Sequence, residues 1–173
     1  KSMKRILFTI SILLNVAFFY TYVQNNWKVN KSENSKIETN KIVGTWKLVA
    51  FADLDTVTGK WIYPFGKTPK GYFTYTKNMI VNLNVSAEEP LHISADSSET
   101  CKINLDNYIW HHSFGYFGSY SVNLKKSVIT HHVKGGTIPY YIDTDQPRPF
   151  SFRGDTLVIG DNKTRKRLLI RAD

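Results

Sequence analysis

The chain has 173 residues, enough for one well-filled hydrophobic core but too few for two domains of ordinary size. Hydrophobic residues make up 42% of the chain and charged residues 21%, a globular composition that excludes a disordered polypeptide. The single cysteine, Cys101, excludes an internal disulfide framework and a structural zinc site built on several cysteines. Aromatic residues reach 14%, which favours a β-rich domain.

The formal net charge of +9 is concentrated near the N-terminus. Residues 1–41 hold seven Lys or Arg and two Asp or Glu, which leaves a net charge of only +4 on residues 42–173. This is an ordinary solvated surface, so we expect no nucleic-acid partner. The most basic stretch, residues 163–167, follows the turn sequence Gly160-Asp161-Asn162, and we expect a solvated hairpin tip there.

Residues 1–26 have the charge pattern of a signal peptide or a signal-anchor helix. Lys1, Lys4 and Arg5 are followed by eighteen uncharged and mostly apolar residues, 6–23. Eighteen helical residues span about 27 Å, close to the ~30 Å thickness of a hydrocarbon core. The sequence predicts either a cleaved signal peptide or a retained anchor helix. In both cases we expect an extracytoplasmic protein, periplasmic or secreted. If residues 6–23 are retained, they anchor the protein in the membrane.

Residues 27–41 are polar and rich in Asn, Ser and Lys, which predicts a flexible tether before a single domain at residues 42–173. Within that domain apolar residues recur with a period of two, as expected for strands with one dry and one wet face. The expected inward residues include Trp46, Leu48 and Ala50; Met79, Val81, Leu83 and Val85; Phe150 and Phe152; and Leu157 and Ile159. About eight to ten short strands predict an all-β fold, an antiparallel barrel or sandwich. The polar segment 86–107 predicts a loop with at most a short helical turn.

Seven sequence blocks follow one another in this domain: Val43–Val49, Thr58–Gly66, Pro69–Thr76, Tyr116–Tyr120, Val128–Val133, Thr144–Phe152 and Gly154–Ile159. Together they resemble the bacterial and fungal lipocalin-like domain family over essentially all of residues 42–173. The resemblance implies a calycin-type antiparallel barrel, open at one end, with a hydrophobic interior. It also implies that Trp46, which follows Gly44, closes the bottom of the barrel with Arg171, the guanidinium packed on the indole. The family pattern is not recognisable at residues 86–110.

His131 and Arg148 are the candidate polar contacts for a ligand in such a barrel. His131 alternates with apolar residues and is expected to point inward, where its imidazole could bind a ligand or be satisfied by a neighbouring tyrosine. Arg148 lies between two prolines and could bind a carboxylate of the ligand, or pair with Asp143 or Asp145. The aromatic candidates for the pocket lining are Tyr63, Tyr75, Tyr120, Tyr141 and Phe152.

These features predict an exported or membrane-tethered protein that binds a small, largely apolar molecule, with His131 and Arg148 holding a polar or acidic end. One alternative is an isomerase- or cyclase-type enzyme using the same cavity, with His131 as base and Arg148 or Tyr120 stabilising negative charge. Another is an envelope protein-interaction module whose barrel is packed solid. The sequence carries no hydrolase, zinc-protease, phosphate-loop or dinucleotide motif, and we expect no cofactor and no metal.

Overall fold

The structure, a computed structural model, describes residues 20–28, 40–92 and 104–173. These residues belong to two compact units, 1–39 and 40–173. In the first unit the described residues are helical, and they include the end of the predicted signal or anchor segment and the start of the predicted tether. Most of the remainder of both predictions lies outside the described residues. Within the described part of the chain, no helix is both long and apolar enough to cross a membrane.

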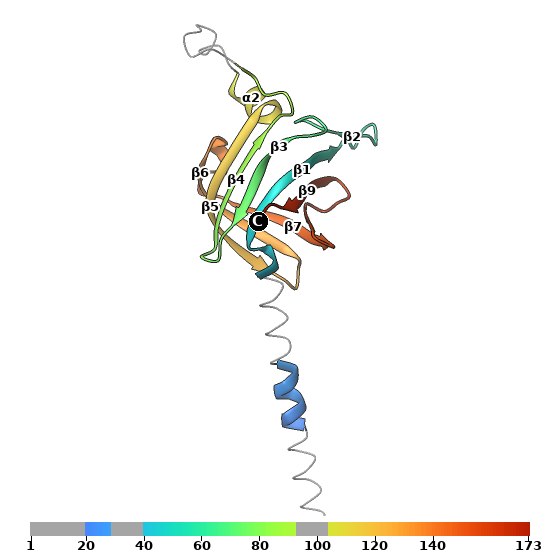
Figure 1. The fold of residues 1–173 in the computed structure, drawn as a ribbon, viewed down its shortest axis with the longest axis vertical. Helices are drawn as coiled ribbons and strands as arrows, with labels where there is room; N and C mark the ends of the chain where they lie inside the picture. Colours follow the sequence, from blue (N-terminus) through green and yellow to red (C-terminus); the bar gives the residue numbers. More distant parts are fainter. Residues whose placement is uncertain (1–19, 29–39, 93–103) are drawn as a thin grey trace, which may run out of the picture. The chain divides into compact units, whose positions relative to one another are not determined.

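The second unit is a closed antiparallel β-barrel (Figure 1). Its strands are β1 (Gly44–Leu54), β2 (Trp61–Ile62), β3 (Lys70–Tyr75), β4 (Ile80–Ser86), β5 (Ser113–Asn123), β6 (Val128–Gly136), β7 (Asp145–Arg153), β8 (Thr156–Ile159) and β9 (Arg165–Arg171). The strands pair in the order β2-β1-β3-β4-β5-β6-β7-β8-β9, and β1 also pairs with β9, so β1 and β3 to β9 close the barrel. The short β2 pairs only with the end of β1. The predicted all-β barrel of eight to ten strands is confirmed, and it is a compact unit with its own hydrophobic core, as is typical of a domain that folds by itself.

Burial with a period of two is clearest in β4. Its residues alternate between the core, where Val81, Leu83 and Val85 lie, and the solvent side, where Ile80, Asn82 and Asn84 lie. Met79, which the sequence placed on the inner face of the strand, instead precedes it in a left-handed turn with φ of 60°. Its side chain is partly buried against the core, so the turn and not the strand sets its direction.

Trp46 and Arg171 close one end of the barrel. They are paired across β1 and β9, and the guanidinium carbon of Arg171 lies 4.4 Å from the centroid of the Trp46 ring. Trp46 Nε1 donates to the Ile42 carbonyl at 2.8 Å, and Arg171 Nη2 donates to the Lys41 carbonyl at 2.7 Å, which fastens the helical turn before β1. Gly44 has a φ of 142°, and a Cβ there would lie 2.3 Å from Arg171 Nη1, so this position requires glycine.

The opposite end of the barrel carries helix α2 (Leu105–His111), near the top of Figure 1. The sequence predicted a loop with at most a short helical turn at residues 86–107, and the helix begins late in that range and runs past it. The Asn104 side chain accepts a hydrogen bond from the Asn107 amide at 2.9 Å and caps the helix. Ile109 is fully buried and anchors the helix on the barrel. Two helical turns are too short for a helical periodicity to be detected in the sequence.

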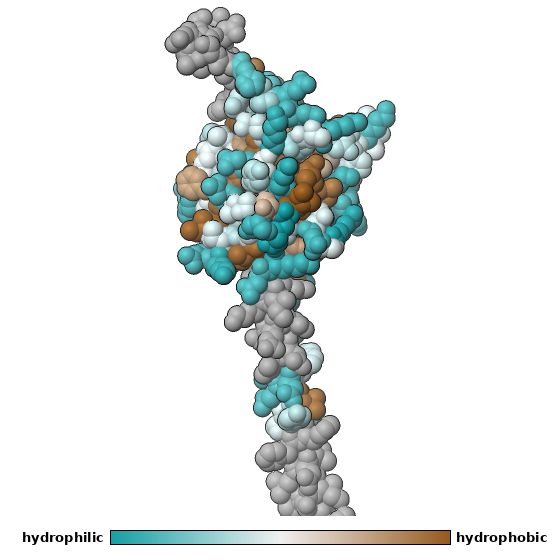
Figure 2. Space-filling model, viewed as in Figure 1, coloured by the Kyte–Doolittle hydropathy of each residue, from teal (hydrophilic) through white to brown (hydrophobic). Residues whose placement is uncertain are grey.

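The face of the barrel that Figure 2 shows is mostly hydrophilic, with smaller groups of hydrophobic residues among the polar ones. The large apolar side chains gather inside instead, in one cluster that runs from Ile42 at the closed end to Ile109 and Ile138. The interior is therefore where an apolar molecule would find a matching surface.

Candidate functional site

A cavity of about 640 Å³ lies in the barrel, at the end opposite Trp46. Its volume falls within the range of roughly 300–1,000 Å³ that small-molecule sites occupy. Its apolar wall is formed by Phe51, Phe73, Leu83, Trp110, Phe114, Ile138, Tyr141 and Ile159. Strands β1, β3, β4, β5 and β8, helix α2 and the 3₁₀ helix η2 (Pro139–Tyr141) all contribute to this wall.

One edge of the cavity follows the first half of β7. This strand pairs with β8 through residues 150–153, and beside them the Gly160 amide donates to the Pro149 carbonyl at 2.7 Å. Pro147 and Pro149 have no N–H, so β7 offers no donor to a neighbouring strand at these two positions. The cavity is lined here by Pro147, Arg148 and Pro149 on one side and by Gly160, Asp161, Thr164 and Arg165 on the other.

His131 lines the inner wall of the cavity, almost completely buried between two tyrosine hydroxyls. Its Nε2 lies 3.0 Å from the hydroxyl oxygen of Tyr75, and its Nδ1 lies 2.8 Å from that of Tyr116. Burial lowers the pKa of His131 to about 3, and Arg148 and His132 act in the same direction, so the ring is neutral at pH 7. A neutral imidazole has one donor and one acceptor nitrogen, so the two tyrosines occupy both. His131 is therefore a fixed part of the wall.

Arg148 lines the same cavity and has no ion pair among the described residues. Its Nη2 donates to Gln146 Oε1 at 3.1 Å, and its Nη1 donates to the carbonyl of Pro147 at 3.2 Å. The guanidinium carbon lies 5.8 Å from the centroid of the Tyr141 ring. Burial raises the pKa of Tyr116 to about 12, and the positive charge of Arg148 acts in the opposite direction. Arg148 thus faces the aromatic interior of the barrel.

The predicted alternative pairing of Arg148 with Asp143 or Asp145 is wrong. Asp145 belongs to β7 but has the opposite parity, so its side chain lies on the outer face, where Oδ1 is 2.6 Å from His132 Nδ1. Asp143 is 2.8 Å from Lys134 Nζ. Strand parity therefore separates Asp145 from the arginine, and Asp143, which precedes the strand, pairs with Lys134 instead.

A second arginine, Arg167, also lies inside the barrel. The sequence placed it in a solvated hairpin tip, and this is wrong, because its side chain is only 16% exposed. Its Nη1 is 2.8 Å from Asp53 Oδ1 and 2.8 Å from the Ala52 carbonyl oxygen, and its guanidinium carbon is 3.4 Å from the centroid of the Phe51 ring. Burial lowers the pKa of Arg167, and Asp53 opposes that change. Arg167 has the strand parity of the buried Leu169, which is the signal that would have placed it inside.

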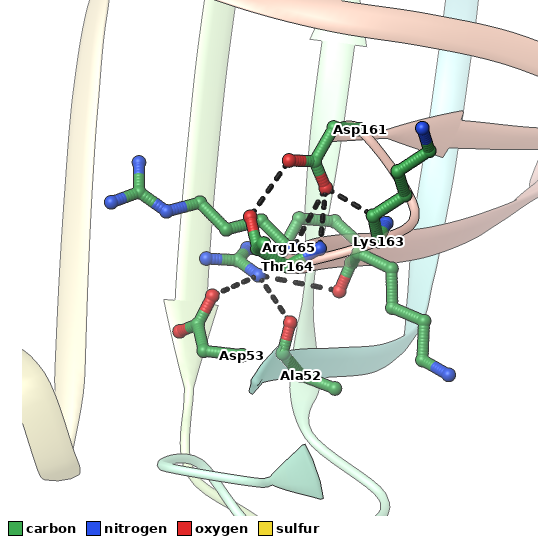
Figure 3. Close-up of polar contacts among 8 residues, drawn as sticks. Ala52, Asp53, Asp161, Lys163, Thr164 and Arg165 are labelled. Atoms are coloured by element: carbon green, nitrogen blue, oxygen red, sulfur yellow. Dashed lines mark hydrogen bonds and ion pairs between the residues drawn. The ribbon is translucent and has the colours of Figure 1, made fainter. Parts of the chain in front are cut away.

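The turn between β8 and β9 is held by Asp161 (Figure 3). Its Oδ1 accepts hydrogen bonds from the amides of Lys163 at 2.9 Å, Thr164 at 2.7 Å and Arg165 at 2.9 Å. Its Oδ2 accepts from the Thr164 hydroxyl at 2.7 Å. The hydroxyl bond and the amide bonds hold the pKa of Asp161 well below its usual range. The hydrogen bonds of the turn therefore use both oxygens of the Asp161 carboxylate, although the side chain of Arg165 also lines the cavity nearby.

Three of the predicted aromatic contacts come close to the cavity. Tyr141 lines it directly. Tyr75 and Tyr120 do not line it but lie behind it in the core, with ring centroids 5.1 Å apart. The Tyr120 hydroxyl donates to the Thr76 carbonyl at 2.9 Å, so its polar group is already satisfied within the protein.

The structure places the other two aromatic candidates away from the cavity. Phe152 packs at the closed end, with its ring centroid 6.1 Å from that of Trp46. Tyr63 is 37% exposed and does not line the cavity, so the expectation that it points inward is wrong. Strand β2 ends one residue before Tyr63, and in the loop that follows it is Phe65 that enters the core.

Ser121, His132 and Asp145 form a hydrogen-bonded series across the outer face of β5, β6 and β7. His132 Nε2 lies 3.0 Å from Ser121 Oγ and its Nδ1 lies 2.6 Å from Asp145 Oδ1. This is the order of nucleophile, base and orienting carboxylate, but none of the three lines the cavity. In the described ranges, no group of three His, Cys, Asp or Glu side chains could hold a metal ion.

A comparison with protein families matches residues 43–171 to a lipocalin-like domain. The matched range begins one residue before β1 and ends with β9, so it coincides with the barrel. A comparison with curated proteins finds no match. The chain belongs to the lipocalin-like domain family.

Proposed function

We propose that the protein binds a small, largely apolar molecule inside its barrel. The observation that carries the proposal is the cavity of about 640 Å³, walled mainly by aromatic and aliphatic side chains. Burying apolar surface contributes about 25 cal/mol per Å² of area removed from water, so a ligand that fills such a cavity gains most of its affinity there. The lipocalin-like barrel suggests small-molecule binding as well.

The same proposal places the protein outside the cytoplasm, exported or tethered to the membrane. What supports this is the order of the N-terminal sequence, in which Lys1, Lys4 and Arg5 precede the uncharged residues 6–23. Proteolytic mapping of the mature N-terminus in the producing cell, together with fractionation, tests this half of the proposal separately from ligand binding.

The geometry favours binding over the two alternatives. An isomerase or cyclase with His131 as base needs a ring nitrogen that takes up a proton near neutral pH, whereas both nitrogens bond to tyrosines and the pKa is lowered to about 3. A protein-interaction module with a solid barrel does not accord with the cavity.

Binding is tested with the barrel unit, residues 40–173, and the neutral fluorophore N-phenylnaphthylamine. We expect saturable binding with one site per barrel. Leu54→Trp adds bulk to a half-buried residue of the cavity wall and should weaken binding at least about tenfold without unfolding the barrel.

Lys126→Gln, in the exposed turn between β5 and β6, is the matched control and should bind like the wild type. Binding that is absent, or that Leu54→Trp leaves unchanged, would contradict the proposal. Native mass spectrometry of protein purified from its own host then identifies the bound molecule.

A further inference from the structure

The cavity contains more positive charge than its carboxylates neutralise. Its charged lining residues are Arg148, Arg165 and Arg167 against Asp53 and Asp161. The walls around them are largely apolar, and in such surroundings a charge acts more strongly than in water. An apolar ligand alone would leave this excess charge without a partner.

We infer that the ligand is an amphipathic anion, whose acidic group, most simply a carboxylate, binds to Arg148 with Arg167 beside it. The inference rests on the proposed binding function and adds the chemical class of the ligand.

Arg148 retains donors that a ligand can use. A guanidinium group has five N–H donors, and Arg148 donates to the neutral oxygens of Gln146 and Pro147. A further side-chain hydrogen bond to the Tyr116 hydroxyl, which opposes the rise in the pKa of that tyrosine, is also made to a neutral group. Its position between two prolines fixes the backbone that carries it, and the Tyr141 ring lies against it. An arginine held in place in this way loses little conformational entropy when it binds a carboxylate through two parallel hydrogen bonds.

Arg167 is held from one side only. All its hydrogen bonds to Asp53, Ala52 and Lys166 start from Nη1. Nε and Nη2 of Arg167 make no hydrogen bond to the described residues. Neither atom is among the buried polar atoms that lack a partner there, which include only His112 Nδ1, so both keep accessible surface. Because Arg167 lines the cavity, those donors are available to a ligand.

The two carboxylates do not cancel the arginines. Asp53 neutralises one guanidinium, that of Arg167. Asp161 is occupied by three backbone amides and one hydroxyl of its own turn. Arg148 and Arg167 are also close enough for the charge of one to lower the pKa of the other. An anion between them would relieve that repulsion.

A pair of fluorophores with the same aromatic body tests the inference. Anilinonaphthalene sulfonate carries an anionic group, and N-phenylnaphthylamine is the same ring system without it. We expect the barrel unit to bind the anionic probe at least about tenfold more tightly at low ionic strength, as charge-assisted hydrogen bonds would produce. Arg148→Gln should weaken binding of the anionic probe at least about tenfold more than it weakens binding of the neutral probe, and so abolish that preference.

Lys163→Gln is the matched control, since it removes one positive charge from the same end of the barrel at a residue that does not line the cavity. Its preference for the anionic probe should remain. Asp53→Asn tests Arg167 in the opposite direction, because removing the counter-charge should tighten binding of the anionic probe by about threefold or more. If Asp53→Asn binds the anionic probe as the wild type does, or more weakly, Arg167 is not part of the site.

The outcomes separate the two proposals. If wild-type protein binds both probes equally, or Arg148→Gln weakens both equally, the ligand class is wrong while the binding cavity stands. If neither probe binds, or Leu54→Trp affects neither, the binding function fails and the anion site with it. Circular dichroism of each variant confirms that the barrel is folded before affinities are compared.

Discussion

At the scale of single residues, the interior polar groups of the barrel have different roles. His131 bonds to Tyr75 and Tyr116 through both ring nitrogens, and its lowered pKa keeps it neutral, so it stiffens the core. Arg148 has only neutral partners, and Arg167 has a carboxylate on one side only. Of these three side chains, only the two arginines therefore keep donors for a ligand, although the sequence singled out His131 and Arg148.

Burial of neutral His131 should make the stability of the barrel depend on pH. The ring titrates near 6.5 in the unfolded chain and near 3 in the folded protein, so the unfolded chain binds more protons between these values. The free energy of unfolding should therefore fall as the pH is lowered through this window, by up to about 1.4 kcal/mol per pH unit from this residue. Urea unfolding between pH of about 7 and about 5 measures the slope.

His131→Gln should be less stable than the wild type and should show a smaller slope in that window. Tyr75→Phe is the matched control, because it removes one hydrogen bond of the ring but keeps the titrating imidazole. Parallel slopes for the wild type and His131→Gln would show that the ring does not cause the pH dependence.

At the scale of elements, β7 and α2 shape the cavity. The two prolines of β7 leave the strand without backbone N–H donors at these positions, beside the β8–β9 turn. Side chains alternate between the two faces of β7, so Asp145 lies outside the barrel and Arg148 inside it. Helix α2 contributes Trp110 to the cavity wall and is fastened by the buried Ile109. A short helix that depends on so few contacts should respond to changes at its cap.

Asn104→Ala should loosen α2 without unfolding the barrel. The substitution removes the acceptor of the Asn107 amide, and loss of an N-cap typically costs about 1 kcal/mol. Hydrogen exchange measured by mass spectrometry should become faster in residues 105–111 and stay unchanged in β3 and β4. Asn104→Asp retains an acceptor and should exchange like the wild type, whereas faster exchange across the barrel in Asn104→Ala would show that the helix is not a separate unit.

At the scale of the whole molecule, closure of the sheet by β1 and β9 joins the two ends of the barrel sequence. The same pairing brings Trp46 against Arg171 at the closed end and Asp53 against Arg167 at the cavity. One strand pair therefore both seals the barrel and builds part of the site.

Arg171→Gln should weaken that closure. It removes the cation from the Trp46 ring and the bonds to the carbonyls of Lys41 and Val43, which together should cost about 1–2 kcal/mol. Urea denaturation should show a lower midpoint with a single transition. Lys125→Gln, in the exposed turn between β5 and β6, removes the same charge and should unfold at the wild-type midpoint; an equal loss in both variants would assign the effect to net charge instead.

The sequence by itself determined the strands, the turns and the side of the strand on which most residues lie, because period-two alternation is a local property of the chain. It led to the barrel, to His131 inside it and to the family. Only the tertiary structure decided which residues meet, since strand pairing joins segments that are far apart in sequence. The register of β1 and β9 pairs Arg167 with Phe51, which lets its guanidinium reach Asp53 diagonally. Arg148 lies apart from Asp145 because the two residues have opposite parity in β7, and the size of the cavity depends on how the strands, α2 and η2 close around it.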